Sequence, residues 1–426
     1  MKILISKANI VNHDGIKMGS DILIENGKIA AIGEHLTIEA GRKINAENLW
    51  VFPGLVDAHC HLRDPGYEYK EDIISGSKSA ARGGFTSVAC MPNTNPVVDN
   101  SAVVSYITEK AKSEAVVNVY PIGAITKGLK GEELSEMGSM KEAGIVAVSD
   151  DGRPVMNSSV MKKAMVYAQQ FNLPVISHCE DLDLAEEGSM NEGAMSTKLG
   201  LRGIPSIAES VMVSRDILLA EYNNVPMHIA HVSNRYSVEL IRQAKKRGVK
   251  VTCETCPHYF TLTDKACENY NTNAKMNPPL QTEDDVLAIK EGLRDGTIDI
   301  IATDHAPHHF DEKNVEFDCA PNGIVGFETA FPLAYTYLVE PGILSLTQLA
   351  EKLSTKPASI LNLDKGIIAC GKDADLTMVD LDTEFTINVS EFASKSKNSP
   401  FDGWKVKGKI IMTIVNGKIV FEASPK

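Results

Sequence analysis

Two histidines separated by one residue, His59 and His61, form the pattern with the clearest chemical meaning in this sequence. They lie near the end of an apolar run that starts at Pro53-Gly54 and stops at Asp64-Pro65-Gly66, which predicts a buried strand. Alternate side chains of a strand point to one face, so both imidazoles project together and can bind one metal ion. A lone His-x-His pair is more often two solvated or hydrogen-bonded imidazoles than a metal site, so a metal site needs further ligands.

Histidines and aspartates also stand at the ends of later strand-like runs. Singly, each has a structural explanation, because an imidazole can cap a buried strand and an aspartate can begin a helix. Jointly this explanation fails, since burying six polar side chains at convergent strand ends is costly without a common partner. Four imidazoles and two carboxylates suit two zinc ions bridged by a carboxylate and a hydroxide. The candidates are His59, His61, one of Asp150 and Asp151 (which strand alternation places on opposite faces), His178, His231 and Asp304.

The middle of the chain alternates between strand-like and helical runs, which is typical of a parallel α/β fold. Eight strands predict a (β/α)8 barrel of the TIM type, although a doubly wound open sheet would show the same alternation. The candidate ligands favour the barrel, because the C-terminal ends of its strands converge on one pocket. The predicted strands are 55–61, 86–91, 117–122, 144–149, 174–178, 226–231, 250–255 and 298–303, and predicted helices include 102–114, 158–171, 207–221 and 238–247.

Both ends of the chain have a different pattern, with short strands and tight turns. Asn26-Gly27 and Asn416-Gly417 each separate two apolar runs, which is a strong hairpin signal. A further strand is predicted at residues 375–380. We therefore expect a small β-sandwich domain built from residues 1–51 and 366–426, beside a barrel formed by residues 52–365.

Composition limits the class of protein. At 426 residues with 43% apolar side chains, the chain is long enough for a barrel with an appended domain. No apolar run approaches the ~20 residues of a membrane span, and the N-terminus lacks a signal-peptide pattern, so we expect a cytoplasmic protein. A net charge of −13 argues against a nucleic-acid or anionic-membrane surface, but not against a small anionic substrate in a local cationic pocket.

The eight cysteines are expected to be thiols, because the chain is long and a cytoplasmic setting is reducing. Cys253 and Cys256 have the spacing of half a zinc ribbon. The chain has no second Cys-x-x-Cys, and a structural zinc site needs four closed ligands. We therefore do not expect a zinc ribbon.

Several segments together resemble the dihydroorotases, a family within the amidohydrolase superfamily, and the resemblance covers nearly the whole chain. Two short motifs occurring together are specific to this family and to close cyclic-amide relatives. The first is His59-Cys60-His61-Leu62-Arg63, and the second begins at Thr303-Asp304-His305. Two departures are Cys60, where a small aliphatic residue is usual, and Asn322, where close relatives often have Phe. Further matching segments are 91–94, 149–152 and 275–279.

The resemblance implies roles for matching positions. His59, His61 and Asp304 would bind the more buried zinc ion, and His178 and His231 the second. Many relatives bridge the ions with a carboxylated lysine after the fourth strand, whereas the long bacterial subgroup uses the second Asp of the pair, which implies Asp151. Asp304 would also be the general acid and base. Substrate contacts are implied for His61, Arg63, Asn93, Asn277, His308 and the backbone at Asn322 and Gly323.

The implied reaction is the reversible cyclisation of N-carbamoyl-L-aspartate to L-dihydroorotate and water in de novo pyrimidine synthesis. The implied assembly is a homodimer that can associate with aspartate transcarbamoylase. Arg63 can bind a substrate carboxylate bidentately, and the polar loop from His308 to Gly323 is expected to order over bound substrate.

Three rival functions use the same features. A hydantoinase or allantoinase would open another ring with the same metals, but it commonly keeps the bridging lysine. A nucleobase deaminase would want Glu three residues after His178, where this chain has Asp181. A non-catalytic scaffold for aspartate transcarbamoylase would not need all six ligands.

Overall fold

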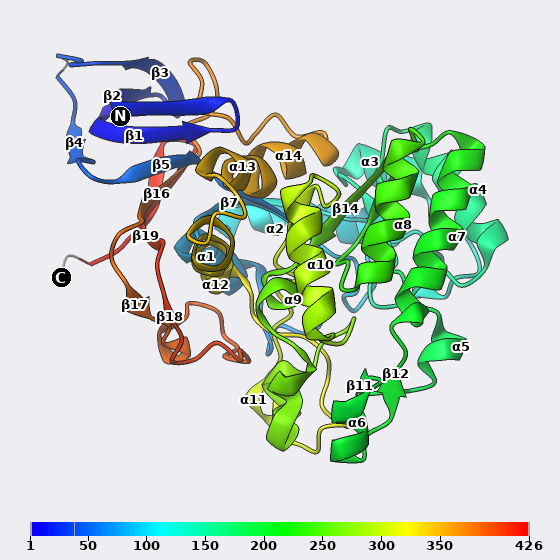
Figure 1. Ribbon diagram of the computed structural model, residues 1–426. Helices are drawn as coiled ribbons and strands as arrows, with labels where there is room; N and C mark the ends of the chain where they lie inside the picture. The colour runs from blue at the N-terminus through cyan, green and yellow to red at the C-terminus, as the bar shows by residue number, and fades with distance from the viewer. Residues whose placement is uncertain (1, 38, 425–426) are drawn as a thin grey trace.

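The computed structural model describes residues 2–37 and 39–424 and has mixed α/β content (Figure 1). Strands from both ends of the chain lie together on one side of the molecule, and the alternating strands and helices of the middle occupy the rest. No helix in the described part of the chain is long and apolar enough to cross a membrane. All eight cysteines are free, as expected.

The middle of the chain contains two parallel sheets. One has the order β6-β7-β8 and the other the order β15-β14-β13-β10-β9. Single parallel bridges join their edges, Gly123 to Val148 and Cys60 to His305. The strands are β6 (Leu55–Cys60), β7 (Phe85–Cys90), β8 (Asn118–Pro121), β9 (Val148–Ser149), β10 (Val175–Ser177), β13 (Met227–Ile229), β14 (Val251–Thr255) and β15 (Ile300–Ile301).

The helices between these strands include all four that the periodicity predicts. Asn100, Asn157 and Asn234 begin three of them, because each side chain accepts hydrogen bonds from backbone amides of the first turn. The helices are α1 (Ile73–Arg82), α2 (Ser101–Glu114), α3 (Met137–Ala143), α4 (Ser158–Gln169), α5 (Leu182–Ala185), α6 (Ala194–Leu199), α7 (Ile207–Asn223), α8 (Arg235–Lys246), α9 (Pro257–Thr261), α10 (Glu283–Arg294), α11 (Phe310–Lys313), α12 (Phe327–Ala334), α13 (Leu346–Ala350) and α14 (Lys356–Ile360).

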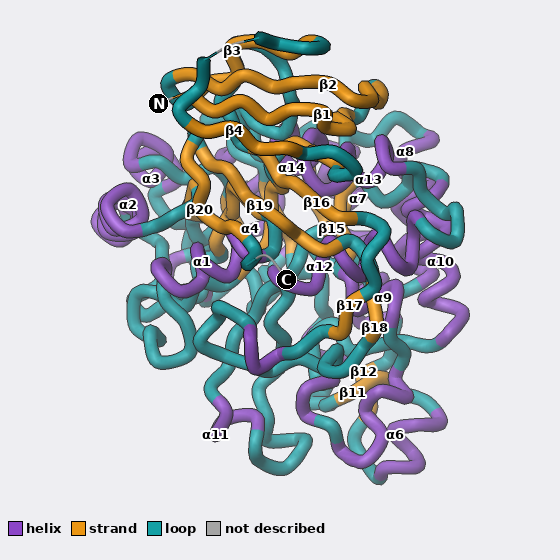
Figure 2. The backbone as a smooth tube through the Cα atoms, turned by 90° about the vertical axis from the view of Figure 1, so that its left-hand side faces the viewer, coloured by secondary structure: helices purple, strands orange, loops and turns teal. Residues whose placement is uncertain are grey.

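Strands from the two ends of the chain form one eight-stranded sheet (Figure 2). Its order is β20-β19-β16-β5-β1-β2-β3, with β4 paired to β1. The predicted hairpins at Asn26-Gly27 and Asn416-Gly417 are confirmed as the antiparallel pairs β2–β3 and β19–β20. The strands are β1 (Lys2–Asn12), β2 (Gly15–Glu25), β3 (Lys28–Gly33), β4 (Arg42–Asn45), β5 (Trp50–Pro53), β16 (Leu376–Asp380), β19 (Lys409–Val415) and β20 (Lys418–Glu422).

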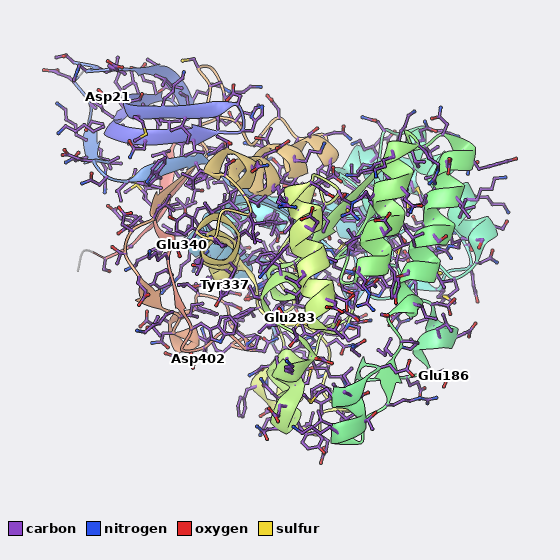
Figure 3. All side chains as sticks on the ribbon, in the orientation of Figure 1. Asp21, Glu186, Glu283, Tyr337, Glu340 and Asp402 are labelled. Atoms are coloured by element: carbon purple, nitrogen blue, oxygen red, sulfur yellow. The ribbon has the colours of Figure 1, made fainter. Side chains whose placement is uncertain are left out.

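Asp21 on β2 shows how a polar group is accommodated in this sheet (Figure 3). Its carboxylate accepts hydrogen bonds from the backbone amides of Lys7, at 2.9 Å, and Leu36, at 2.8 Å. The buried residues beneath the sheet form an apolar cluster of their own, separate from the larger cluster around the parallel strands.

Connections after the parallel strands gather at one end of the molecule, the lower end in Figure 1, where α5, α6 and α11 lie. Two small sheets belong to these connections and to the C-terminal part. They pair β11 (Met190–Asn191) with β12 (Gly203–Ile204), and β17 (Phe385–Thr386) with β18 (Lys405–Val406).

Candidate metal centre

The predicted ligands converge at the C-terminal ends of the parallel strands. His59 is on β6 with His61 just beyond it, and the other four follow β9, β10, β13 and β15. Parallel strands bring their C-terminal ends to one edge, so residues far apart in sequence meet there. All six side chains are buried, with exposed fractions from 0% to 7%: His59, His61, Asp151, His178, His231 and Asp304.

Asp151 is the centre of this group. Its Oδ1 lies 3.3 Å from His59 Nε2, and its Oδ2 lies 3.5 Å from His61 Nε2. On the other side, Oδ1 lies 3.5 Å from His231 Nε2 and 3.8 Å from His178 Nδ1. The carboxylate of Asp151 therefore stands between two pairs of imidazoles, in the position of a bridge.

Asp150 points elsewhere, which resolves the choice that strand alternation left open. Its carboxylate accepts hydrogen bonds from the backbone amides of Ile125, at 2.7 Å, and Thr126, at 3.0 Å. It also accepts from the Thr126 hydroxyl. Asp150 thus ties the end of β9 to the segment after β8.

These residues fit metal ions. Two groups place one ligand atom per residue within 4.8 Å of one another, namely His59, His61 and Asp151, and Asp151, His178 and His231. His59 Nε2, Asp151 Oδ1 and His231 Nδ1 are buried without a hydrogen-bond partner in the described part of the chain. Unpaired buried polar atoms are costly, and a bound cation would satisfy the first two directly.

Electrostatic attraction between the imidazoles and carboxylates of the cluster shifts their pKa values. Burial raises the pKa of the Asp151 carboxyl, but the neighbouring His59 and His231 more than offset this and lower it well below its usual range. Burial likewise opposes ionisation of His59, yet Asp151 and Glu254 raise its pKa well above the ordinary value. The pKa of Asp304 is lowered too, chiefly by the hydrogen bond with His61 against the cost of burial. Both aspartates are therefore carboxylates at neutral pH, as metal ligands must be.

Backbone strain accompanies the site. Arg63, His231 and Asp304 have φ of 61°, 32° and 47°, in the left-handed region that non-glycine residues rarely adopt. Such strain is retained where the surrounding structure fixes it, and it concentrates at functional sites. Each of these residues follows the end of a strand, where the turn directs its side chain toward the cluster.

Arg63, Asn93 and His308, three of the predicted substrate contacts, lie beside the ligands. Asn93 Oδ1 lies 2.9 Å from His61 Nδ1, which leaves His61 Nε2 for Asp304 at 3.1 Å. Arg63 is half-buried, donates to the Pro307 carbonyl oxygen at 3.2 Å and lies 3.3 Å from His308 Nε2.

The remaining predicted contacts have protein partners in this structure. Asn277 Nδ2 donates to Glu180 Oε2 at 3.0 Å. The Gly323 amide donates to the Lys275 carbonyl oxygen at 2.9 Å, and the Asn322 carbonyl oxygen lies 2.8 Å from His308 Nε2. The Asn322 side chain is exposed.

Sequence reasoning missed two carboxylates that orient the imidazoles. Glu254 on β14 is fully buried, with Oε1 2.6 Å from His59 Nδ1 and Oε2 3.1 Å from His228 Nε2. Glu180 Oε2 lies 3.4 Å from His178 Nε2. A Glu inside a strand predicted to be buried is the signal that could have identified Glu254, because a buried charge needs a partner.

A large cavity lies away from this cluster. Its volume is about 780 Å³, and its lining includes Arg82, Glu328 and Phe421 but none of the predicted site residues.

The geometry and the comparisons with known proteins define a class. A family model described as "Dihydro-orotase-like" matches residues 49–237, and one described as "Amidohydrolase family" matches residues 283–421. Among solved structures, the L-hydantoinase (dihydropyrimidinase) from Arthrobacter aurescens has a TM-score of 0.89 and 29% sequence identity, covering 99% of this chain and 96% of that one. The protein is therefore an amidohydrolase.

Curated relatives narrow this class. A dihydroorotase from Acetivibrio thermocellus is 65% identical over 409 residues, covering 96% of this chain and 95% of the relative. Those from Ruminiclostridium cellulolyticum and Geobacter metallireducens are 62% and 57% identical, and each covers at least 98% of both chains. The chain belongs to the dihydroorotase family.

Proposed function

We propose that this protein catalyses the reversible cyclisation of N-carbamoyl-L-aspartate to L-dihydroorotate and water. The observation that carries the proposal is the convergence of four imidazoles on Asp151, with Asp304 against His61 and with Arg63 at the edge of the same cluster. The dihydroorotase names of the curated relatives give the ring that is opened and closed.

We further infer that the eight parallel strands form a closed (β/α)8 barrel over residues 52–365. The bridges from Gly123 to Val148 and from Cys60 to His305 support closure, since they join the two parallel sheets at both edges. The eight-stranded sheet supports a second domain formed by residues 1–51 and 366–426. Its sandwich arrangement stays a prediction.

Two zinc ions are the proposed cofactors. His59, His61 and Asp304 would hold one, His178 and His231 the other, and Asp151 both. Imidazole and carboxylate suit zinc. When bound, such ions lower the pKa of water and polarise the amide carbonyl.

The side chains of the chain then have distinct tasks. Asp304 accepts the proton of the attacking water and delivers it to the ring nitrogen as the carbon–nitrogen bond breaks. In the synthetic direction the same carboxylate takes a proton from the attacking nitrogen and returns it to the departing water. His61 Nε2 and Asp304 Oδ1 lie 3.1 Å apart, close enough for both to be ligands of the same zinc ion, which would fix the Asp304 carboxylate beside the reacting atoms.

Arg63 and Asn93 are the proposed ligands of the substrate carboxylate. The Arg63 guanidinium offers a planar pair of donors, which matches a carboxylate better than an ammonium group does. His308, Asn277 and the backbone of Asn322 and Gly323 would complete the substrate site after the present protein contacts rearrange. A cytoplasmic homodimer with an aspartate transcarbamoylase partner remains part of this proposal, by resemblance alone.

The test is hydrolysis of L-dihydroorotate by the zinc-loaded protein, with hydantoin and allantoin as competing substrates. We expect turnover of dihydroorotate alone, and its loss in the Asp304→Asn variant. Turnover of hydantoin in preference to dihydroorotate would reject the proposed ring. No turnover of any ring with two zinc ions bound would favour the scaffold function, or a requirement for aspartate transcarbamoylase as a partner.

A further inference from the structure

The two cysteines of the Cys253-x-x-Cys256 motif have different surroundings. The Cys253 thiol donates to the Thr297 carbonyl oxygen at 3.4 Å, on the side of β14 away from the ligand cluster. Cys256 directly follows the end of β14, between this strand and α9. The motif therefore does not act as a pair.

Cys256 instead belongs to a third group of potential ligands. Its thiol, an imidazole nitrogen of His258 and a carboxylate oxygen of Asp304 lie within 4.8 Å of one another. All three residues are buried, with exposed fractions of 0%, 1% and 7%. Of the three, only Asp304 takes part in the centre proposed above.

A second observation concerns His258, a member of this group. His258 Nε2 is buried and has no hydrogen-bond partner in residues 2–37 and 39–424. Leaving such a nitrogen unpaired is costly, and a cation would satisfy it.

We propose that Cys256, His258 and Asp304 form an additional site for a soft divalent cation such as Zn²⁺ or Cd²⁺. Thiolate, imidazole and carboxylate are the three donor types that zinc accepts, and water can complete a tetrahedron. Thiolate selects soft cations over Mg²⁺ and Ca²⁺. Binding converts the Cys256 thiol to a thiolate, and its proton leaves to solvent.

Occupation of this site has a consequence that rests on the proposed function. Asp304 is the proposed general acid and base, with one oxygen on zinc and the other free for the proton. A third cation on that second oxygen leaves the carboxylate no oxygen to carry the proton. Excess Zn²⁺ or Cd²⁺ therefore inhibits the enzyme, while the two ions around Asp151 stay in place.

Cadmium reports this site directly, because a cadmium–thiolate bond absorbs in the ultraviolet and a bond to imidazole or carboxylate does not. The exposed Cys319 and Cys370 would contribute the same signal, so the parent protein for the test carries Cys319→Ser and Cys370→Ser. Zinc-loaded parent is titrated with Cd²⁺ while absorbance and retained zinc are measured on the same samples. We expect one equivalent of thiolate-bound cadmium with both zinc ions retained.

Variants of Cys256, Cys253 and His258 show which side chains produce the cadmium–thiolate band. Cys256→Ser should abolish the band, and Cys253→Ser, the matched control in the same motif, should retain it. His258→Gln should keep the band but weaken cadmium binding by more than the ~10-fold typical of an indirect partner. A band that survives Cys256→Ser, the absence of a band in the parent, or His258→Gln binding as tightly as the parent would overturn the proposal.

Inhibition is scored separately as the ratio of dihydroorotate hydrolysis with and without Cd²⁺. We expect Cys256→Ser to relieve it. If the parent hydrolyses no dihydroorotate but shows the Cys256-dependent band, the cation site stands and the proposed function fails. If the parent hydrolyses dihydroorotate and shows no band, the reverse holds.

Discussion

The imidazole of His59 is oriented through its Nδ1 atom by a chain of polar side chains. Thr252 Oγ1 lies 2.8 Å from His228 Nδ1, His228 Nε2 lies 3.1 Å from Glu254 Oε2, and Glu254 Oε1 lies 2.6 Å from His59 Nδ1. A histidine that donates one ring N–H to a carboxylate presents the other nitrogen to a metal in a fixed direction and with greater basicity. In this arrangement His59 would bind the proposed zinc ion through Nε2, the atom that faces Asp151.

Glu254→Gln should therefore weaken metal binding without removing a ligand. Loss of the carboxylate leaves His59 less basic and less firmly oriented, and we expect a ~10- to 100-fold loss of zinc affinity. Competition with a chelator measures this affinity. The control is Glu209→Gln, which removes another buried carboxylate outside the cluster. Equal zinc affinity in wild type and Glu254→Gln would show that His59 does not depend on this chain.

Arg63→Lys tests recognition of the substrate carboxylate. Lysine keeps the charge but loses the planar pair of donors, so we expect KM for dihydroorotate to rise about tenfold, equivalent to ~1.4 kcal/mol of binding, with a smaller change in kcat. Steady-state kinetics give both constants. Arg82→Lys is the control, because Arg82 pairs with Glu328 outside the cluster. A fall in kcat at constant KM would contradict a binding role for Arg63.

The residues Asp150 and Asp151 show what can be predicted at this scale and what cannot. Strand alternation predicts that they point to opposite faces, and they do, but it does not say which face is the site. That choice depends on Ile125 and Thr126, whose amides bind Asp150. Family resemblance selects Asp151. Glu254 lies inside the predicted strand 250–255, and strand alternation alone does not predict that its carboxylate contacts His59.

At the scale of elements, the segment between His308 and Gly323 is anchored to the chain around Lys275. Lys313 on α11 is buried and donates through Nζ to the carbonyl oxygens of Pro321, at 2.8 Å, and Lys275, at 3.4 Å. Burial lowers the pKa of Lys313 to about 7. Its backbone oxygen accepts from the Thr272 hydroxyl at 2.6 Å. These hydrogen bonds hold the segment against the chain around Lys275.

Lys313→Met should loosen this segment. The variant loses both Nζ hydrogen bonds, so we expect faster proteolytic cleavage within residues 310–323 and a higher KM for dihydroorotate, because His308 contacts Asn322 in the same segment. Mass spectrometry of timed digests locates the cuts. Lys352→Met removes another buried lysine, whose Nζ donates to Ile298, and should leave this segment protected. Equal cleavage in wild type and Lys313→Met would mean that Lys313 does not anchor it.

Each of the eight predicted strands coincides with an observed parallel strand, but all except 86–91 are predicted longer than the observed strand. Residues 298–303 were predicted as a strand, whereas β15 spans only Ile300–Ile301. The apolar run 298–303 is longer than the strand, because residues on either side of the strand are also buried in the core. Beyond Ile301 the backbone changes partner: the Ala302 amide donates to the Thr255 carbonyl oxygen at 3.0 Å, whereas the Asp304 amide donates to the His59 carbonyl oxygen at 3.0 Å. Such long-range contacts leave no trace in local periodicity.

At the scale of the whole molecule, several carboxyl groups are buried where the charged form is disfavoured. Burial raises the pKa of Asp57, Glu209 and Glu328 to about 7 in each case, against hydrogen bonds that lower it. Glu209 on α7 is the simplest case to test. Its carboxyl group accepts hydrogen bonds from the amide and hydroxyl of Ser233, and it forms no ion pair within the described part of the chain. Its protonation should couple folding to pH.

Glu209→Gln isolates this coupling. The folded pKa of about 7 exceeds the unfolded value of ~4.3, so between these values the folded state binds more protons than the unfolded state. The stabilisation is complete below pH ~4.3 and is lost as pH rises to ~7, up to about 4 kcal/mol for this group. Glutamine resembles the protonated side chain and does not titrate. The unfolding free energy of wild type minus that of the variant, from urea titrations, should therefore fall across this window and level off above it, whereas a constant difference would mean that Glu209 is ionised in the folded protein. Because all other titrating groups are shared by the two proteins, their contributions cancel in the difference.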